Sequence, residues 1–275
     1  MHQVRQPAVA GTFYHSDRLV LQTNVNDLLD TALLEANNEK QSENLFSPKA
    51  IIVPHAGYIY SGPTAATAYA RLRAGRDTIK RVVLLGPVHR VPVNGLALPG
   101  VSVFATPLGR VQVDLDAITA IENMPQVVES VAAHALEHSL EVQLPFLQTV
   151  LEDFTLVPLA VGDATAEQVA EVLERLWGGP ETVIVISSDL SHFLPYETAC
   201  AIDKETVDNI LNLHGPLNHQ QACGGTPVNG LMLAARQHHL HPKLLDLRNS
   251  GDTAGDKNRV VGYASIAFTE GADHG

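Results

Sequence analysis

From about residue 49 onward, the chain alternates short apolar runs with segments of helical periodicity. Both faces of the apolar runs are hydrophobic, which is typical of strands buried on both sides. Such strands separated by helices favour a largely parallel sheet covered on each face. Strands are predicted at 50–53, 81–85, 155–159, 182–186, 244–247 and 260–268, and helices at 63–73, 166–176, 198–213 and 227–238. With no strong boundary, we predict one three-layer α/β/α domain over residues 1–275, with a mostly parallel or mixed central sheet.

An amphipathic helix is predicted near the start of the chain, with Ser16 as its N-cap. A polar stretch at 35–47, rich in Asn, Glu, Gln and Lys, is predicted to link this helix to the rest of the chain. Apolar residues at helical spacing form one face of this helix: Leu21, Val25, Leu28, Leu29 and Ala32.

A second helical pattern contains a proline. Leu140, Leu144, Leu147 and Leu151 are at helical spacing, but Pro145 would remove a hydrogen bond inside such a helix. The helix therefore either kinks at Pro145 or begins at Leu144.

Composition excludes several classes of partner. With 18 Lys and Arg against 30 Asp and Glu, the formal net charge is −12, which argues against binding to nucleic acid or to an anionic membrane surface. No apolar run approaches the roughly 20 residues that span a bilayer, and the first residues lack the apolar core of a signal peptide. We therefore expect a cytoplasmic protein whose two cysteines, Cys200 and Cys223, are reduced.

Three predicted strands each lead into a histidine. His55 follows 50–53, His89 follows 81–85 and His192 follows 182–186. Functional groups of open α/β sheets gather at the carboxyl ends of the strands, so these side chains are expected at one edge. Any one of them could instead cap a helix or face solvent, but three at one edge favour a shared metal or catalytic site.

A cysteine is a candidate for the anionic ligand of that site. Cys223 lies in a glycine-containing turn just before a predicted helix, where a thiolate is stabilised. Two histidines and one anionic ligand would leave positions on a divalent ion open for substrate or oxygen. The alternative is an inert residue packed in a turn, and for Cys200, in a helical pattern, we favour such a buried thiol.

Asp189 and His192 form a candidate proton-transfer pair. They are three residues apart after one strand, so the carboxylate is expected to hold the imidazole in one tautomer. The chain contains no Gly-x-Ser-x-Gly elbow, no P-loop and no dinucleotide-binding fingerprint.

Several motifs together make the chain resemble the Memo family. They are Pro-Ala-Val-Ala-Gly-Thr-Phe-Tyr at 7–14, Pro-His-Ala-Gly-Tyr-Ile-Tyr-Ser-Gly at 54–62, Leu-Gly-Pro-Val-His at 85–89, Glu-His-Ser-Leu-Glu-Val-Gln-Leu-Pro-Phe-Leu at 137–147, Ser-Ser-Asp-Leu-Ser-His at 187–192 and Ala-Cys-Gly at 222–224. This family is structurally similar to the class III extradiol dioxygenases, which are non-haem iron enzymes.

The resemblance implies a set of site residues. His55, His89 and Cys223 would face a metal, with Asp189 and His192 in the same cleft. Cysteine stands where the dioxygenases have a glutamate ligand, and Arg90 follows His89 where many relatives carry a second histidine. Four further motif residues are expected to line the pocket or orient ligands, the alternative for the last three being a solvated helix end: Tyr58, Glu137, His138 and Glu141.

The resemblance implies a metal-dependent, oxygenase-like oxidoreductase acting on a small molecule, with Fe(II) as the expected ion and zinc or copper as alternatives. A metal-dependent hydrolase would use the same cleft. The third hypothesis is a non-catalytic module that binds a peptide or partner, because animal Memo proteins are linked to signalling and motility. Bacterial relatives are associated with a radical-SAM protein and an AMME-type domain, which are therefore possible partners.

Overall fold

A mixed, mostly parallel sheet forms the centre of the computed structural model, which describes residues 4–38 and 47–271. Its middle consists of four parallel strands in the order β8 (Thr155–Val161), β3 (Arg81–Pro87), β9 (Thr182–Ser187) and β2 (Ala50–Val53). The strand β12 (Val260–Glu270) runs antiparallel to β2, and it also pairs with β11 (Leu240–Asn249) and β10 (His192–Leu194). The α/β architecture predicted from the sequence is confirmed.

Five short strands extend the sheet beyond β8, and the hydrophobic pattern did not predict them. They are only two to five residues long, so a period of two is hardly repeated within any of them. These strands are β1 (Val4–Arg5), β4 (Leu96–Leu98), β5 (Val103–Thr106), β6 (Gly109–Val113) and β7 (Val127–Glu129).

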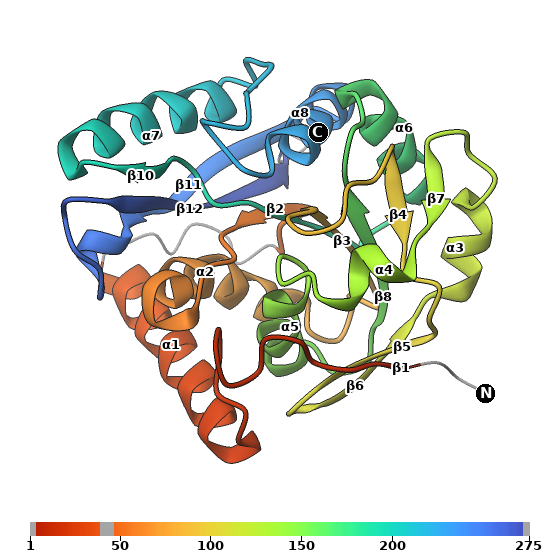
Figure 1. Cartoon of the computed structure of the whole chain (residues 1–275), viewed down its shortest axis with the longest axis horizontal. Coiled ribbons are helices and arrows are strands. Elements are labelled where there is room, and N and C mark those ends of the chain that lie inside the picture. The colour runs from red at the N-terminus through yellow and green to blue at the C-terminus, as the bar shows by residue number, and fades with distance from the viewer. Residues whose placement is uncertain (1–3, 39–46, 272–275) are drawn as a thin grey trace.

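Helices cover both faces of the sheet (Figure 1). One layer contains α1 (Arg18–Asn38), α2 (Tyr58–Leu72) and α5 (Leu144–Val150), and the other contains α3 (Leu115–Ile121), α6 (Ala166–Leu176), α7 (Tyr196–Leu211) and α8 (Gly225–Gln237). The short helix α4 (Val131–Ala135) contacts β4. No helix in the described parts of the chain has the length and apolar composition needed to cross a membrane.

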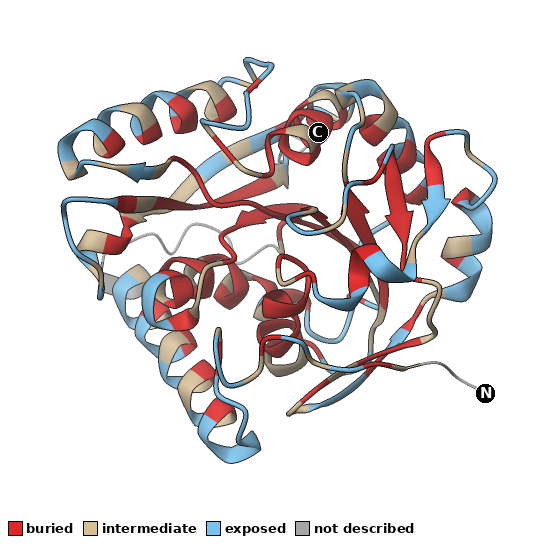
Figure 2. Ribbon diagram, in the orientation of Figure 1, coloured by how far each residue is buried: buried red, intermediate tan, exposed pale blue. Residues whose placement is uncertain are grey.

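Two hydrophobic cores result, one on each face of the sheet. In β2, Ile51 and Val53 belong to one core while Ala50 and Ile52 belong to the other, as strand alternation requires. Figure 2 shows the buried residues concentrated along the central strands and on the helix faces turned toward them. The residues that follow the central strands are therefore attached to a part of the sheet that is packed on both faces.

The start of α1 differs from the prediction. The N-cap is Asp17 and not Ser16, because Asp17 Oδ1 accepts hydrogen bonds from the backbone N–H groups of Leu19 and Val20 at 2.9 and 3.0 Å. The predicted apolar face is buried apart from Leu28, which is partly exposed. Because the helix continues to Asn38, the first residues of the predicted linker are helical, and 39–46 lie outside the described residues.

Prolines affect the starts of two helices differently. The helix around Pro145 begins at Leu144, as one of the two alternatives predicted, and Pro145 lies in its first turn, where no backbone donor is needed. A 3₁₀ turn, η2 (Glu141–Gln143), precedes it. In contrast, α2 begins at Tyr58 and contains Pro63 in its interior, so the start predicted near Pro63 is wrong. The added first turn buries Tyr58 and Ser61.

Candidate metal centre

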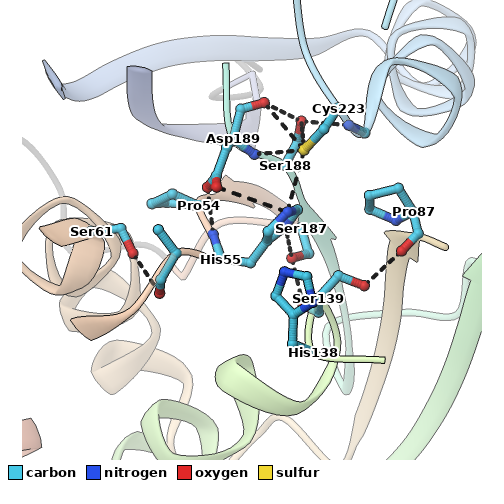
Figure 3. Close-up of polar contacts among 12 residues, drawn as sticks. Pro54, His55, Ser61, Pro87, His138, Ser139, Ser187, Ser188, Asp189 and Cys223 are labelled. Atoms are coloured by element: carbon cyan, nitrogen blue, oxygen red, sulfur yellow. Dashed lines mark hydrogen bonds and ion pairs between the residues drawn. The ribbon is translucent and has the colours of Figure 1, made fainter. Parts of the chain in front are cut away.

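Adjacent parallel strands bring two of the histidines together. Strand β9 lies between β2 and β3, and all three end at the same edge of the sheet. His55 follows the end of β2 by two residues, and His89 follows the end of β3 by two. A third histidine, His138, comes from the segment between α4 and η2 (Figure 3).

The three imidazoles of His55, His89 and His138 converge. One ring nitrogen from each lies within 4.8 Å of the others, a spacing that can hold a single metal ion. The ring centroids are 5.1 Å apart for His55 and His89, 4.6 Å for His89 and His138, and 5.4 Å for His55 and His138. We call His55, His89 and His138 the histidine cluster, or the group. His55 is buried, whereas the side chain of His89 is 31% exposed, so solvent reaches the cluster on the side of His89.

A serine fixes the tautomer of His55. Ser187 Oγ donates its only proton to Ser139 O at 2.6 Å, so at 2.8 Å it can only accept from His55 Nδ1. His55 Nε2 therefore carries the lone pair that faces the group. Burial lowers the pKa of His55 well below its usual value, and the neighbouring His89 and His138 act in the same direction.

A buried glutamine completes this network. Gln143 Nε2 donates to Ser187 Oγ at 2.9 Å and to Pro54 O at 3.0 Å, and Tyr69 Oη donates to Gln143 Oε1 at 2.9 Å. Neither Ser187 nor Gln143 is among the site residues predicted from the sequence. Their positions in the motifs at 187–192 and 137–147 were the available signal.

Glu137 orients the imidazole of His89 and the backbone that carries His138. Its carboxylate accepts the backbone N–H of His89 at 2.6 Å, His89 Nδ1 at 2.9 Å, and the backbone N–H groups of His138 and Ser139, each at 3.0 Å. Since an ionised carboxylate only accepts, His89 carries its proton on Nδ1 and directs Nε2 away from Glu137. Burial acts to raise the pKa of Glu137, but hydrogen bonds from His89 and Ser139 lower it to about 2.

Cys223 lies beside His55. Its Sγ is 3.3 Å from His55 Nε2, and the backbone N–H of Asp189 donates to the sulfur at 3.3 Å (Figure 3). The close approach depends on Gly224, because a Cβ there would lie 2.7 Å from the Cβ of Ser188. Burial, with Asp189 nearby, raises the pKa of the thiol to about 12. The structure thus places Cys223 against one of the three histidines.

Sequence comparisons identify the family. The family model described as "Memo-like protein" matches residues 5–267. The chain belongs to the Memo family. Curated proteins named as MEMO1 family proteins are similar over nearly their whole length: one from Aquifex aeolicus is 38% identical, covering 97% of this chain and 99% of the relative. One from Ignicoccus hospitalis is 36% identical (96% and 98%), and one from Sulfolobus acidocaldarius is 35% identical (96% and 99%).

Two residues of the Memo motif at 187–192 lie in the same region but do not bond to each other. Asp189 Oδ1 accepts the backbone N–H of His55 at 2.7 Å, and Oδ2 is 3.9 Å from His55 Nε2. His192 Nδ1 lies 2.8 Å from Leu190 O, which can only accept, so His192 Nε2 carries the lone pair. A backbone carbonyl therefore sets the tautomer that we had expected Asp189 to set.

Two more residues expected to line the pocket, Tyr58 and Glu141, make their hydrogen bonds to other segments of the chain. Tyr58 Oη donates to Val142 O at 2.6 Å, and its ring packs against Phe146. The carboxylate of Glu141 accepts from Tyr14 Oη and from the backbone N–H groups of Ala8 and Val9, and it pairs with Arg5. Both side chains hold neighbouring segments together.

The second cysteine, Cys200, lies on α7. Cys200 accepts a hydrogen bond from Asn249 Nδ2 at 3.5 Å and is half-buried, where we had predicted a buried thiol. Cys200 and Cys223 are both free thiols in the structure, as expected.

Replacing Glu137 by glutamine is expected to lower the unfolding free energy of the metal-free protein at neutral pH. The same change should reduce how strongly that free energy depends on pH below 4.5. The pKa is lower in the folded state than its ordinary 4.5, so the ionised carboxylate stabilises the fold above pH 4.5, and this contribution is lost as the pH falls toward 2. The lowering of the pKa from 4.5 to about 2 corresponds to a contribution of about 3 kcal/mol to the unfolding free energy. Urea unfolding between pH 2 and 7, with a chelator present, measures it.

The exposed Glu122 provides the control, since Glu122→Gln should leave the pH profile unchanged. An unaltered profile in Glu137→Gln would show that the hydrogen bonds to Glu137 contribute no net stability.

Proposed function

We propose that the protein binds a divalent metal ion between His55, His89 and His138 and acts as an oxygenase-like enzyme on a small molecule. The convergence of three imidazoles is the observation that carries this proposal. Neutral imidazole is the commonest metal ligand, and two of the three rings donate their Nδ1 proton to groups of the chain. The donor set therefore fits a first-row transition metal.

Ferrous iron is the proposed ion, with zinc and copper as alternatives. Three protein ligands leave positions free on an ion of higher coordination number, and the exposed side of His89 gives access to them. When bound, such an ion supplies Lewis acidity and, in the case of iron, redox chemistry. Family membership is compatible with this proposal but names no reaction.

His192 is the proposed base. Its Nδ1 proton is engaged by Leu190 O, so Nε2 is free to accept a proton from a substrate hydroxyl. His192 begins β10, three residues after Asp189, whose Oδ1 accepts the backbone N–H of His55 at 2.7 Å, and this connection supports a role for His192 beside the three histidines. In this scheme Asp189 fixes the backbone at His55, and His192 takes the proton.

A hydrolase is the second candidate because all three converging ligands are neutral. An ion held by imidazoles alone keeps its full charge, which lowers the pKa of a bound water and favours hydrolysis. Only the family resemblance supports the third role, a module that binds a peptide or a partner such as a radical-SAM or AMME-domain protein.

Anaerobic reconstitution with ferrous iron is expected to give oxygen uptake that depends on a chelating substrate. An oxygen electrode and a panel of catechols measure it, after metal analysis of protein purified without oxygen. The His192→Ala variant should keep its iron and lose turnover, because His192 is proposed to move a proton and not to bind metal.

If the purified protein contains stoichiometric zinc and hydrolyses esters, the oxygenase proposal is wrong and the hydrolase proposal takes its place. Loss of iron in His192→Ala would make His192 a ligand.

A further inference from the structure

The least constrained of the three imidazoles is that of His138. His55 Nδ1 and His89 Nδ1 each make a hydrogen bond shorter than 3 Å. His138 Nδ1 is 3.3 Å from Glu137 Oε1, an oxygen that already accepts three N–H groups. Hydrogen bonding therefore orients this ring weakly, and its orientation must come mainly from packing.

Three aromatic rings lie against that of His138, and the ring of His55 is the most distant of them at 5.4 Å between centroids. The ring of His89 lies 4.6 Å away between centroids, and that of Phe13 lies 4.7 Å away at an interplanar angle of 44°. His55 and His89 belong to the histidine cluster itself, whereas Phe13 belongs to the N-terminal segment, defined here as residues 5–14. Among the described residues, Phe13 is thus the aromatic ring from outside the histidine cluster that packs against His138.

Buried polar contacts fix the N-terminal segment against the loop that carries His138. Arg5 Nη2 donates to Glu137 O at 2.7 Å and Arg5 Nε donates to His134 O at 3.0 Å. Arg5 Nη1 pairs with Glu141, and Glu141 also accepts the backbone N–H groups of Ala8 and Val9 at 2.7 and 3.0 Å. The segment is thus anchored on both sides of His138 in the sequence.

A further bond joins Phe13 to the side of His55. The backbone N–H of Tyr58, three residues after His55, donates to Phe13 O at 2.8 Å. Phe13 therefore spans the two parts of the chain that carry His55 and His138, and its position depends on both.

We propose that Phe13 is a positioning residue of the metal centre and that the N-terminal segment completes the site by holding the His138 imidazole toward His55 and His89. This inference rests on the proposed metal function. It also assigns a role to Glu141, which acts on the site through the segment that it anchors.

Titration with Co(II) tests the proposal in the full chain. Phe13→Ala is expected to weaken Co(II) binding about tenfold, the lower end of the range for residues that orient a metal ligand. Phe13→Leu, which keeps an apolar side chain against His138, should stay close to wild type. Thr12→Ala is the matched control, because Thr12 lies in the same segment and its hydroxyl bonds only to Val9 O among the described residues.

A double-mutant cycle separates positioning from a general structural effect. In a His138→Ala background, Phe13→Ala should cause no further loss of Co(II) affinity. An equal loss in both backgrounds would overturn the proposal, as would unchanged affinity in Phe13→Ala.

NMR of the metal-free protein gives a readout that does not depend on metal. The ring signals of His138 should broaden or shift in Phe13→Ala and not in Thr12→Ala, and unchanged signals would contradict the positioning role. If wild-type protein binds no Co(II), the metal function fails whatever the NMR result. If it binds Co(II) and Phe13→Ala does too with equal affinity, only the role of Phe13 fails.

Discussion

Replacing His138 by alanine is expected to lower zinc and ferrous iron affinity by more than about 100-fold, whereas Cys223→Ser should keep most of it. Loss of a residue that merely orients a ligand costs about 10- to 100-fold, and loss of a ligand costs more. Cys223 contacts only His55 of the three histidines, and burial raises the pKa of its thiol to about 12. Removing the thiol should mainly reduce the preference for soft metals.

Competition with a chelator of known affinity measures both variants. The control is His241→Ala, which removes an exposed histidine from β11. A larger loss in Cys223→Ser than in His138→Ala would restore His55, His89 and Cys223 as the ligand set, as the family resemblance implied.

Replacing Glu141 by glutamine is expected to cost roughly 3–5 kcal/mol of unfolding free energy. Glu141 is fully buried and pairs with Arg5, which is 6% exposed, so the substitution leaves a buried guanidinium without its counter-charge. Urea unfolding at pH 7 in the presence of a chelator measures the effect.

Glu152→Gln is the matched control. Its partner is Arg76, and both side chains of this ion pair are about half exposed, so the loss should stay within about 1 kcal/mol. Equal effects in the two variants would mean that the buried pair contributes no more than a surface pair.

Strand-end positions in the sequence identified His55 and His89 correctly as neighbours because the parallel strands β2 and β3 both flank β9. His138 does not follow a predicted strand, so no strand-end position points to it. It lies in a region where β4 and β7 are three residues long and the helices are short, so periodicity could not place it. A long-range contact brought it to the site, and only the motif match pointed there.

The motif at 137–147 also shows what local spacing cannot decide. A regular helix would have put His138 and Glu141 on one face, but a 3₁₀ turn begins at Glu141. Glu137 consequently points to the histidines and Glu141 to the N-terminal segment. Similarly, Asp189 and His192 are close in sequence but separate in bonding, because β10 begins at His192 and pairs with β12.

The bonds that Glu137 makes have a consequence for the energetics of ligand binding. They join groups of the chain itself, so folding orders the His89 imidazole and the backbone that carries His138. The rotamer entropy of the His89 side chain is then lost in folding and does not have to be lost again when a ligand binds. Preorganisation of this kind ties affinity to the local stability of the loop. Substitutions that loosen the loop should therefore weaken binding even when every ligand atom is retained.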